Sequence, residues 1–118
     1  MTLDEYFKEK DESRKIFDSL RSVIQTFDGV KMRVTKSQVA FYRRKSFAWA
    51  WIPGKYVRGK VALLVLTLSL SFKDASPRWK EIVEPRPGRF THHLELHFIS
   101  DIDDEVREWV RAAWTEAA

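Results

Sequence analysis

The chain contains no cysteine and only four glycines among its 118 residues. Without cysteine it can form neither disulfide bonds nor thiolate metal sites, and this composition is compatible with a reducing cytoplasm. The few glycines form no loop of the kind that cradles phosphate groups, and no serine is flanked by glycines as in a nucleophile elbow. The composition therefore argues against P-loop nucleotide binding and against serine hydrolases of that type.

Long apolar runs are missing as well. No stretch approaches the ~20 apolar residues of a membrane-spanning helix. The first residues, Met1 to Tyr6, are acidic and lack the basic start and apolar middle of a signal peptide. A chain of this length can bury one core, so we expect a single cytoplasmic domain over residues 1–118 that does not contact a membrane.

The chain is organised around one stretch, residues 61–72. Its first half is apolar at every position and its second half alternates leucine with threonine or serine, which predicts the central strand of a sheet. The predicted core face carries Ala62, Leu64, Leu66, Leu68, Leu70 and Phe72. The other face carries Val61, Leu63, Val65, Thr67, Ser69 and Ser71. This second face runs from apolar to hydroxyl-bearing, and we expect any function to lie on it.

Helical patterns mark both ends of the chain. Thr2 and Glu5 have capping-box spacing and open a short helix to about Lys8. A second helix starts at Asp11 or Ser13, ends at Asp28-Gly29, and carries the apolar stripe Ile16, Phe17, Leu20, Val23, Ile24 and Phe27. A last helix begins at Ser100 or Asp101, with the stripe Ile102, Val106, Trp109, Val110, Ala113 and Trp114.

Between these ends the hydrophobic period changes to two. This alternation predicts strands over 30–34, 39–42 and 47–52 before the central strand, and a fifth strand over 89–98. In the long connection, residues 76–83 have the pattern of a short helix with Pro77 at its first position. The order indicates an α+β fold: one domain, with about five strands in a mainly antiparallel sheet and the N-terminal and C-terminal helices packed mainly on one face.

Charge is segregated along the chain. Residues 1–30 carry 5 basic and 7 acidic side chains (−2), residues 31–89 carry 14 and 3 (+11), and residues 90–118 carry 2 and 7 (−5). In a meander the basic residues gather at both sheet ends, with Lys36, Lys55, Arg58 and Lys60 at one and Arg43, Arg44, Lys45, Lys73, Arg78 and Lys80 at the other. The asymmetry favours an anionic partner, either nucleic acid or a small anionic ligand. The alternative is that the opposed fields cancel and serve only solubility.

Aromatic residues are concentrated on one predicted strand. Phe47, Trp49 and Trp51 alternate with Ala48 and Ala50, so the rings are expected on the second sheet face beside the central strand. Trp79, in the connection, could form a lid over them. A patch of this kind is covered internally, forms a homodimer interface, or lines a ligand cleft.

The fifth strand carries the residues most suited to chemistry. His93 and Glu95 share one face with His97, but the outer two positions of this row are roughly 13–14 Å apart, which is too wide for both to bind one metal ion. His92 lies on the apolar face, where a hydrogen-bonded core histidine is the simpler interpretation. Arg89 begins the strand. Lys36, between Thr35 and Ser37, could offer a cation and hydroxyl groups to an anion, although such turn residues often satisfy their own backbone.

Four runs of the chain resemble a bacterial family of domains of unknown function, number 5655. They are Arg33-Val-Thr-Lys-Ser-Gln-Val-Ala-Phe41, Arg78-Trp-Lys-Glu81, Arg89-Phe-Thr-His-His-Leu-Glu-Leu96 and Asp103-Asp-Glu-Val-Arg-Glu-Trp109. Thr-Lys-Ser and His-His-x-Glu-Leu are the most specific pieces. The resemblance spans nearly the whole chain and implies a small α+β domain that also occurs attached to nuclease-like or other domains. It implies no established activity and no catalytic residues.

The sequence thus predicts a non-catalytic binding or interaction module for an anionic partner. The candidate ligand-binding residues are Lys36, Trp49, Trp51, Trp79, Arg89, His92, His93 and Glu95. No cofactor, metal ion or catalytic residue is assigned. The alternatives are a hydrolytic enzyme that uses His93, Glu95 and a cation such as Arg89 or Lys36, and a homodimerisation module that pairs through the tryptophan face.

Overall fold

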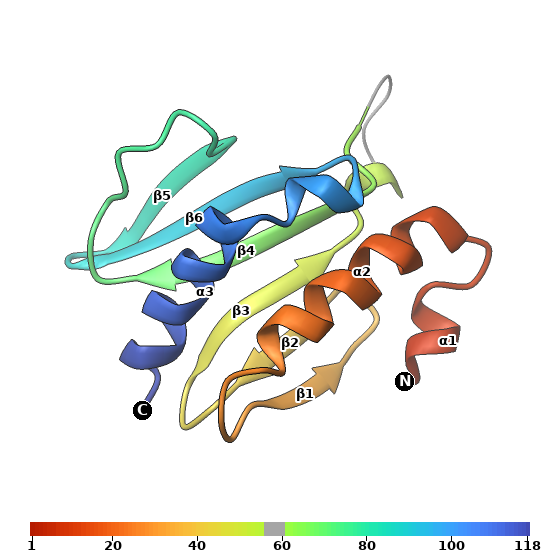
Figure 1. Ribbon diagram of the computed structural model, residues 1–118, viewed down its shortest axis with the longest axis horizontal. Helices are drawn as coiled ribbons and strands as arrows, with labels where there is room; N and C mark the ends of the chain where they lie inside the picture. Colours follow the sequence, from red (N-terminus) through yellow and green to blue (C-terminus); the bar gives the residue numbers. More distant parts are fainter. Residues whose placement is uncertain (56–60) are drawn as a thin grey trace.

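The computed structural model describes residues 1–55 and 61–118 (Figure 1). The helices are α1 (Leu3–Tyr6), α2 (Asp11–Ile24) and α3 (Asp104–Glu116), with short 3₁₀ turns η1 (Pro53–Lys55) and η2 (Ile99–Asp101). The strands are β1 (Lys31–Val34), β2 (Val39–Tyr42), β3 (Ser46–Trp51), β4 (Leu64–Leu70), β5 (Glu81–Arg86) and β6 (Arg89–Leu96). The predicted basic residues Arg58 and Lys60 lie outside the described residues. None of the helices in the described part of the chain has the length and apolarity needed to cross a membrane.

The sheet has six antiparallel strands in the order β1-β2-β3-β4-β6-β5, and α2 and α3 lie across one of its faces (Figure 1). This arrangement confirms the predicted α+β fold, with one strand more than expected. β4 is central, between β3 and β6, as the unbroken apolar run of its sequence predicts. Among residues 1–55 and 61–118, the helices leave the opposite face of the sheet uncovered (Figure 1).

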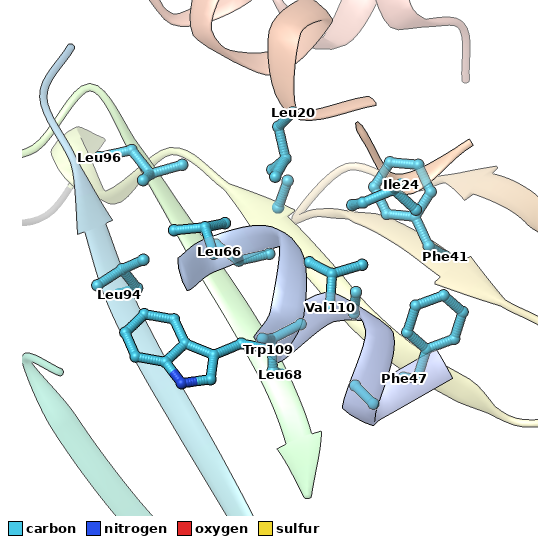
Figure 2. Packing of buried hydrophobic residues seen from close by; sticks show 14 of the residues in the cluster. Leu20, Ile24, Phe41, Phe47, Leu66, Leu68, Leu94, Leu96, Trp109 and Val110 are labelled. Carbon is cyan, nitrogen blue, oxygen red and sulfur yellow. The ribbon is translucent and has the colours of Figure 1, made fainter. Parts of the chain in front are cut away.

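The core lies between the sheet and the two long helices (Figure 2). Leu20 and Ile24 of α2 and Trp109 and Val110 of α3 pack against alternate residues of the strands, and all four are buried. The small side chains of Ala48 and Ala50 lie under the helices and are fully buried, because close approach of a helix to a strand favours small residues. The apolar face of the sheet therefore packs against the apolar stripes of the two helices, as predicted.

Two helix boundaries differ from the predicted ones. Helix α3 begins after Asp103 instead of Ser100 or Asp101, because the Asp103 carboxylate accepts a hydrogen bond from the backbone N–H of Val106 and caps the first turn. Helix α2 ends at Ile24, before the predicted Asp28-Gly29, but Phe27 of its stripe is still buried.

Strand β5 was not predicted: its first residues, 81–83, fall in the short helix predicted over 76–83. Its residues pair with β6 as an edge strand, and the hairpin turns through Gly88, whose φ of 80° suits glycine. Pro85 is tolerated in such a strand because an edge position does not require every N–H. The Ser76-Pro77 signal instead forms an isolated turn, in which Ser76 Oγ accepts from the N–H of Arg78 at 3.2 Å.

Two side chains do not lie where strict strand alternation predicted them. Phe47 is 1% exposed and packs in the core near Val110 (Figure 2), because the pairing of β2 with β3 slips between Phe41 and Tyr42. The slip leaves one extra residue on β3, so the strict alternation that would have put Phe47 beside Trp49 is broken. Phe72 was predicted in the core but is 44% exposed, since β4 ends at Leu70.

Candidate functional site

The uncovered face of the sheet carries a row of residues that lie directly opposite one another on all six strands. From edge to edge the register aligns Arg33, Ala40, Trp49, Thr67, His93 and Glu81. Neighbouring members of such a row have their Cβ atoms about 4.5–5.5 Å apart. The row therefore brings an indole, a hydroxyl and an imidazole together at the centre of the face.

A hollow of about 530 Å³ lies over this part of the face. It will be called the aromatic hollow, and it is lined by Ser37, Gln38, Trp49, Trp51, Thr67, Ser69, Thr91 and His93. The lining offers two indole rings, four hydroxyl groups, one amide and one imidazole. None of these described residues carries an acidic or a lysine or arginine side chain. Such a surface combines flat apolar area with many hydrogen-bonding groups.

A chain of hydrogen bonds runs across the floor of the aromatic hollow. Nε1–H of Trp51 donates to Thr67 Oγ1 at 2.9 Å, and this oxygen lies 2.8 Å from His93 Nδ1. The Trp51 and His93 rings stand edge to face, with their centroids 6.1 Å apart. Because the three residues come from β3, β4 and β6, each side chain is held by a neighbouring strand. The hydrogen bonds fix the orientation of the imidazole.

Burial lowers the pKa of His93 below its ordinary value of 6.5, and the Glu81 carboxylate opposite it on β5 partly counters this effect. The ring is therefore neutral at pH 7. Thr67 already accepts from Trp51, so its own proton is available to donate to Nδ1. In that arrangement the second ring nitrogen, Nε2, carries the proton. His93 then presents a neutral imidazole to the hollow.

Helix α1 supports one rim of the aromatic hollow. The hydroxyl of Tyr6 donates to the carbonyl of Ser37 at 3.1 Å and accepts from the N–H of Ile52 at 3.3 Å. Within the turn, Thr35 Oγ1 accepts from the N–H of Gln38 at 3.3 Å, so the residues that precede Gln38 are also fixed. The turn between β1 and β2 is thereby tied to the end of β3.

A second hollow, of about 380 Å³, adjoins the first. It will be called the basic hollow, and its lining comprises Lys45, Ser46, Phe47, Trp49, Ser69, Arg86, Arg89, Ala113, Glu116 and Ala117. Trp49 and Ser69 line both hollows, so the two are continuous across these side chains. The basic hollow lies where the last turn of α3 reaches the end of the sheet.

Arg89 is the cation of the basic hollow that hydrogen bonds to other side chains hold in place. Its Nη2 donates to Ser69 Oγ at 2.7 Å, and its Nη1 donates to Glu116 Oε1 at 2.9 Å. The other carboxylate oxygen, Oε2, accepts from the N–H and the hydroxyl of Ser71 at 3.2 and 2.9 Å. Ser71 and Arg89 thus both donate to the Glu116 carboxylate, and Ser69 accepts from the same Arg89.

The predicted site residues divide between several places. Trp49, Trp51 and His93 line the aromatic hollow together, and Arg89 lies in the basic hollow. Lys36 is exposed in the turn next to Ser37, at the rim. Glu95 pairs across from Val65 and lines neither hollow, so it does not share a hollow with His93.

His92 and Trp79 lie on the opposite, helix-covered side of the sheet. His92 is fully buried: its Nε2 accepts from the N–H of Asp74 at 3.0 Å, and its Nδ1 lies 3.1 Å from the carbonyl of Phe90. Trp79 is 8% exposed, packs against Trp109, and donates its Nε1–H to Asp74 Oδ2 at 2.9 Å. The prediction that Trp79 forms a lid over the tryptophan face is therefore wrong, because its ring completes the core instead.

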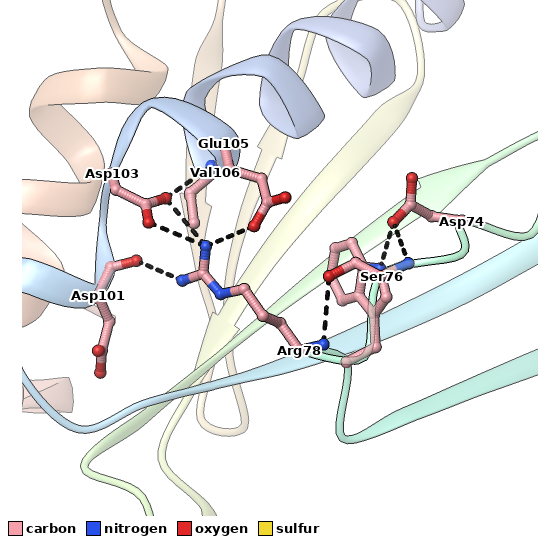
Figure 3. A network of polar contacts seen from close by, with 8 residues as sticks. Asp74, Ser76, Arg78, Asp101, Asp103, Glu105 and Val106 are labelled. Atoms are coloured by element: carbon pink, nitrogen blue, oxygen red, sulfur yellow. Dashed lines mark hydrogen bonds and ion pairs between the residues drawn. The ribbon is translucent and has the colours of Figure 1, made fainter.

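Arg78 was predicted to lie at a basic end of the sheet. Its side chain instead contacts residues at the start of α3, on the helix-covered side (Figure 3). Its Nη1 contacts the carboxylates of Asp103 at 3.0 Å and Glu105 at 2.8 Å, and Nη2 donates to the carbonyl of Asp101 at 2.9 Å. These contacts tie the connection after β4 to the start of α3. Two of the acidic side chains of the C-terminal segment, those of Asp103 and Glu105, are therefore bound on the helix side, away from the aromatic hollow.

Sequence reasoning missed several lining residues. Gln38 reaches the aromatic hollow from the turn between β1 and β2, and Arg86 reaches the basic hollow from β5. Glu116 reaches Arg89 from the end of α3, and no local pattern marks that pairing. Within residues 1–55 and 61–118, no three histidine, aspartate or glutamate side chains are grouped closely enough to hold a metal ion.

The chain was compared with known families, curated proteins and solved structures. The family model described as "Domain of unknown function (DUF5655)" matches residues 3–117. Neither the curated proteins nor the solved structures yielded a match. Since the family match runs through every helix and strand described above, the chain belongs to the DUF5655 family of domains.

Proposed function

We propose that this domain is a non-catalytic binding module for an anionic ligand that carries a flat polar ring, such as a nucleotide or a single-stranded segment of nucleic acid. One observation carries the proposal: Trp49, Trp51 and His93 share one hollow, and that hollow opens onto a second one lined by Lys45, Arg86 and Arg89. The lack of cysteine suits a cytoplasmic location for this binding.

The aromatic hollow supports the ring-binding half of the proposal. Its volume of about 530 Å³ falls within the range of roughly 300–1,000 Å³ typical of small-ligand pockets. The half-buried indoles of Trp49 and Trp51 offer stacking surface, while Gln38 and the hydroxyl groups offer donors and acceptors to the edge of a base. Stacking on aromatic side chains is the main contribution to sequence-tolerant binding of single strands.

Charge supports the anionic half. Lys45, Arg86 and Arg89 line the basic hollow, and Lys36 lies at the rim of the aromatic one. The acidic residues at the start of α3 would repel a polyanion if they shared this face. Asp103 and Glu105 are instead bound to Arg78 on the helix side. The positive field of the middle of the chain can then act on a ligand at the uncovered face.

The proposal is tested by titrating the protein with nucleoside 5′-monophosphates and with short single-stranded oligonucleotides, using intrinsic tryptophan fluorescence and anisotropy. We expect saturable binding that weakens between 50 and 200 mM salt, because phosphate contacts release counterions. Trp49→Leu should weaken binding about tenfold, which corresponds to the loss of one stacked base. Phe98→Leu is the control, since this aromatic residue is 68% exposed and lines neither hollow.

Absence of saturable binding by all of these ligands would overturn the proposal. A dimeric mass in light scattering, together with a Trp49→Leu variant that becomes monomeric, would instead support homodimerisation through the tryptophan face. Binding that is unchanged between the two salt concentrations would exclude nucleic acid as the ligand.

A second candidate function is hydrolysis with His93 as the general base. The observation that favours it is the fixed, neutral imidazole at the floor of the aromatic hollow, oriented by Thr67 at 2.8 Å. This role requires the other tautomer, in which Nδ1–H donates to Thr67 Oγ1 and the unprotonated Nε2 can accept a proton from water near pH 7. Cleavage of a phosphodiester by the wild type that is lost in His93→Gln, with nucleotide binding retained, would establish this activity. Equal background rates in both proteins would exclude it.

A further inference from the structure

We infer that the basic hollow binds the phosphate group of the proposed ligand. Without a ligand the Glu116 carboxylate pairs with the Arg89 guanidinium, and the phosphate group replaces this carboxylate on binding. The inference rests on the proposed function and deepens it. The ligand class is then a phosphorylated ring compound, such as a nucleotide. The corresponding nucleoside, which lacks the phosphate group, should bind more weakly.

The two hollows are close enough to hold one ligand. Trp49 and Ser69 line both of them. Along β4, Ser69 follows Thr67 on the same face, a step of roughly 7 Å in a strand. A ring that stacks beside Trp49 with its polar edge toward Thr67 therefore has its substituent directed past Ser69. The first cation beyond Ser69 is Arg89, which Ser69 contacts at 2.7 Å.

The donors around Glu116 are those that bind an oxyanion. One carboxylate oxygen accepts from the Arg89 guanidinium, and the other accepts from the backbone N–H and the hydroxyl of Ser71. Guanidinium, backbone N–H and hydroxyl groups are also the usual partners of phosphate, and a guanidinium can present two parallel donors to it. Glu116 thus stands in this structure where a phosphate oxygen pair would bind.

The positive charges in the lining of the basic hollow outnumber its negative ones. Its lining contains Lys45, Arg86 and Arg89 against the single carboxylate of Glu116. Arg86 and Arg89 are opposed in the β5–β6 register, and like charges in that position are destabilising. Neither Lys45 nor Arg86 forms an ion pair within the described parts of the chain. A phosphate dianion would offset this excess of positive charge more fully than Glu116 does.

Release of Arg89 is feasible for a ligand in this position. The Arg89–Glu116 pair is partly exposed, with 32% and 24% of the two side chains accessible, so its net contribution to folding is small. Glu116 lies in the last turn of α3, where its side chain can move into solvent without repacking the core. The carboxylate therefore competes with the ligand, and this competition sets the affinity for phosphate.

The test compares uridine and adenosine with their 5′-monophosphates, and adds inorganic phosphate as a probe of the basic hollow alone. In the wild type we expect each nucleotide to bind about tenfold or more tightly than its nucleoside, as expected for one charge-assisted contact. Arg89→Gln should reduce this difference several-fold, leaving only the contribution of Lys45 and Arg86, and should leave nucleoside affinity unchanged. Glu116→Gln should tighten nucleotide and phosphate binding several-fold. Glu108→Gln, an exposed acid of α3 outside both hollows, controls for the change in net charge.

The outcomes separate the two proposals. Nucleotides and nucleosides that bind equally, with no effect of Glu116→Gln, would overturn the phosphate subsite and leave ring binding in place. Inorganic phosphate that shifts the Ser71 amide resonance in Glu116→Gln, without binding of any nucleoside or nucleotide, would support the subsite and overturn the proposed function. If Glu108→Gln tightened binding as much as Glu116→Gln, general charge would be responsible and the inference would fail. Circular dichroism of each variant establishes that it is folded.

Discussion

Thr67 and His93 lie directly opposite each other on β4 and β6, and Thr67 Oγ1 is 2.8 Å from His93 Nδ1. The same hydroxyl accepts from the indole N–H of Trp51 at 2.9 Å. One buried hydroxyl thus satisfies two polar groups that face a hollow. Thr67 is the residue on which the geometry of the aromatic hollow depends most.

Replacement of Thr67 by valine tests this dependence, because valine keeps the β-branched shape and removes only the hydroxyl group. We expect Thr67→Val to lower the free energy of unfolding by about 1–3 kcal/mol, since it leaves the Trp51 N–H and His93 Nδ1 without their partner. The measurement is urea denaturation followed by circular dichroism.

Thr91→Val is the matched control. Thr91 lines the same hollow, but its hydroxyl makes no hydrogen bond to the other residues that the structure describes. Its replacement should change stability by less than about 0.5 kcal/mol. Equal costs for the two substitutions would mean that Thr67 contributes only its methyl packing.

The electrostatic setting of His93 gives a prediction that does not depend on any ligand. The carboxylate of Glu81 raises the pKa of His93 against the larger, opposite effect of burial. Glu81→Gln should therefore lower the pKa of His93 further, as measured by NMR titration of its ring resonances. Glu95→Gln, on the same strand face as His93, should shift that pKa less. A larger shift from Glu95→Gln would contradict the placement of β5 beside β6.

The central part of the site could be predicted from sequence because it depends on strand alternation alone. The hydroxyl positions of β4, the tryptophans of β3 and His93 of β6 all follow a period of two, and their strands are adjacent in the sheet. Strand alternation fails to predict the position of Phe47. A slip in the pairing of β2 with β3 adds one residue to β3 and turns Phe47 into the core, and the alternating sequence does not signal the slip.

The basic hollow could not be predicted in the same way. It forms where a hairpin, the turn before β3 and the last turn of α3 meet, so its residues are distant in sequence. Strand β5 was missed because the Ser76-Pro77 signal favours a helix start and two prolines follow, whereas its actual structure depends on pairing with β6. The Arg89–Glu116 contact depends on where α3 ends over the sheet. Such tertiary arrangements leave no periodic pattern.

Buried His92 leads to a prediction about stability and pH. Because the N–H of Asp74 donates to Nε2, that nitrogen holds no proton, and the neutral ring carries its proton on Nδ1, toward the carbonyl of Phe90. Burial lowers the pKa of His92 below 6.5. The unfolded chain thus binds a proton in a range where the native state does not, and stability falls as the pH drops below about 6.5 toward the lowered value.

We expect the free energy of unfolding to decrease between pH 7.5 and pH 5. The carboxylates with lowered pKa values, Glu5, Asp74 and Asp103, titrate mainly below this range, since their ordinary values are 4.5 for Glu5 and 3.8 for the two aspartates. His92→Gln should reduce the slope, because the glutamine amide can accept from the backbone and does not titrate. Urea denaturation at each pH supplies the measurement. A slope that is unchanged in His92→Gln would assign the pH dependence to His93 or to other groups.

The last prediction concerns the Arg78 contacts, which hold the connection after β4 against the start of α3 (Figure 3). Arg78 contacts Asp103, Glu105 and the carbonyl of Asp101, and its guanidinium lies 5.4 Å from the centroid of the Trp109 ring. Arg78→Gln should lower the free energy of unfolding by about 1–3 kcal/mol, because it leaves several acceptors without a donor. Arg78→Lys should recover only part of this loss, since an ammonium group cannot reproduce the planar fork.

Arg14 provides the comparison for Arg78. Its side chain is similarly exposed, at 29% against 30%, and it also pairs with two carboxylates, those of Asp4 and Asp18. These partners are more exposed than those of Arg78, at 93% and 55% against 47% and 50%, so Arg14→Gln should cost less than about 1 kcal/mol. Addition of 1 M salt should reduce the effect of Arg14→Gln more completely than that of Arg78→Gln, since exposed pairs are screened more strongly. If the two arginines proved equivalent in both measurements, the Arg78 contacts would be ordinary surface pairs, and the connection after β4 would be held by the packing of Trp79 alone.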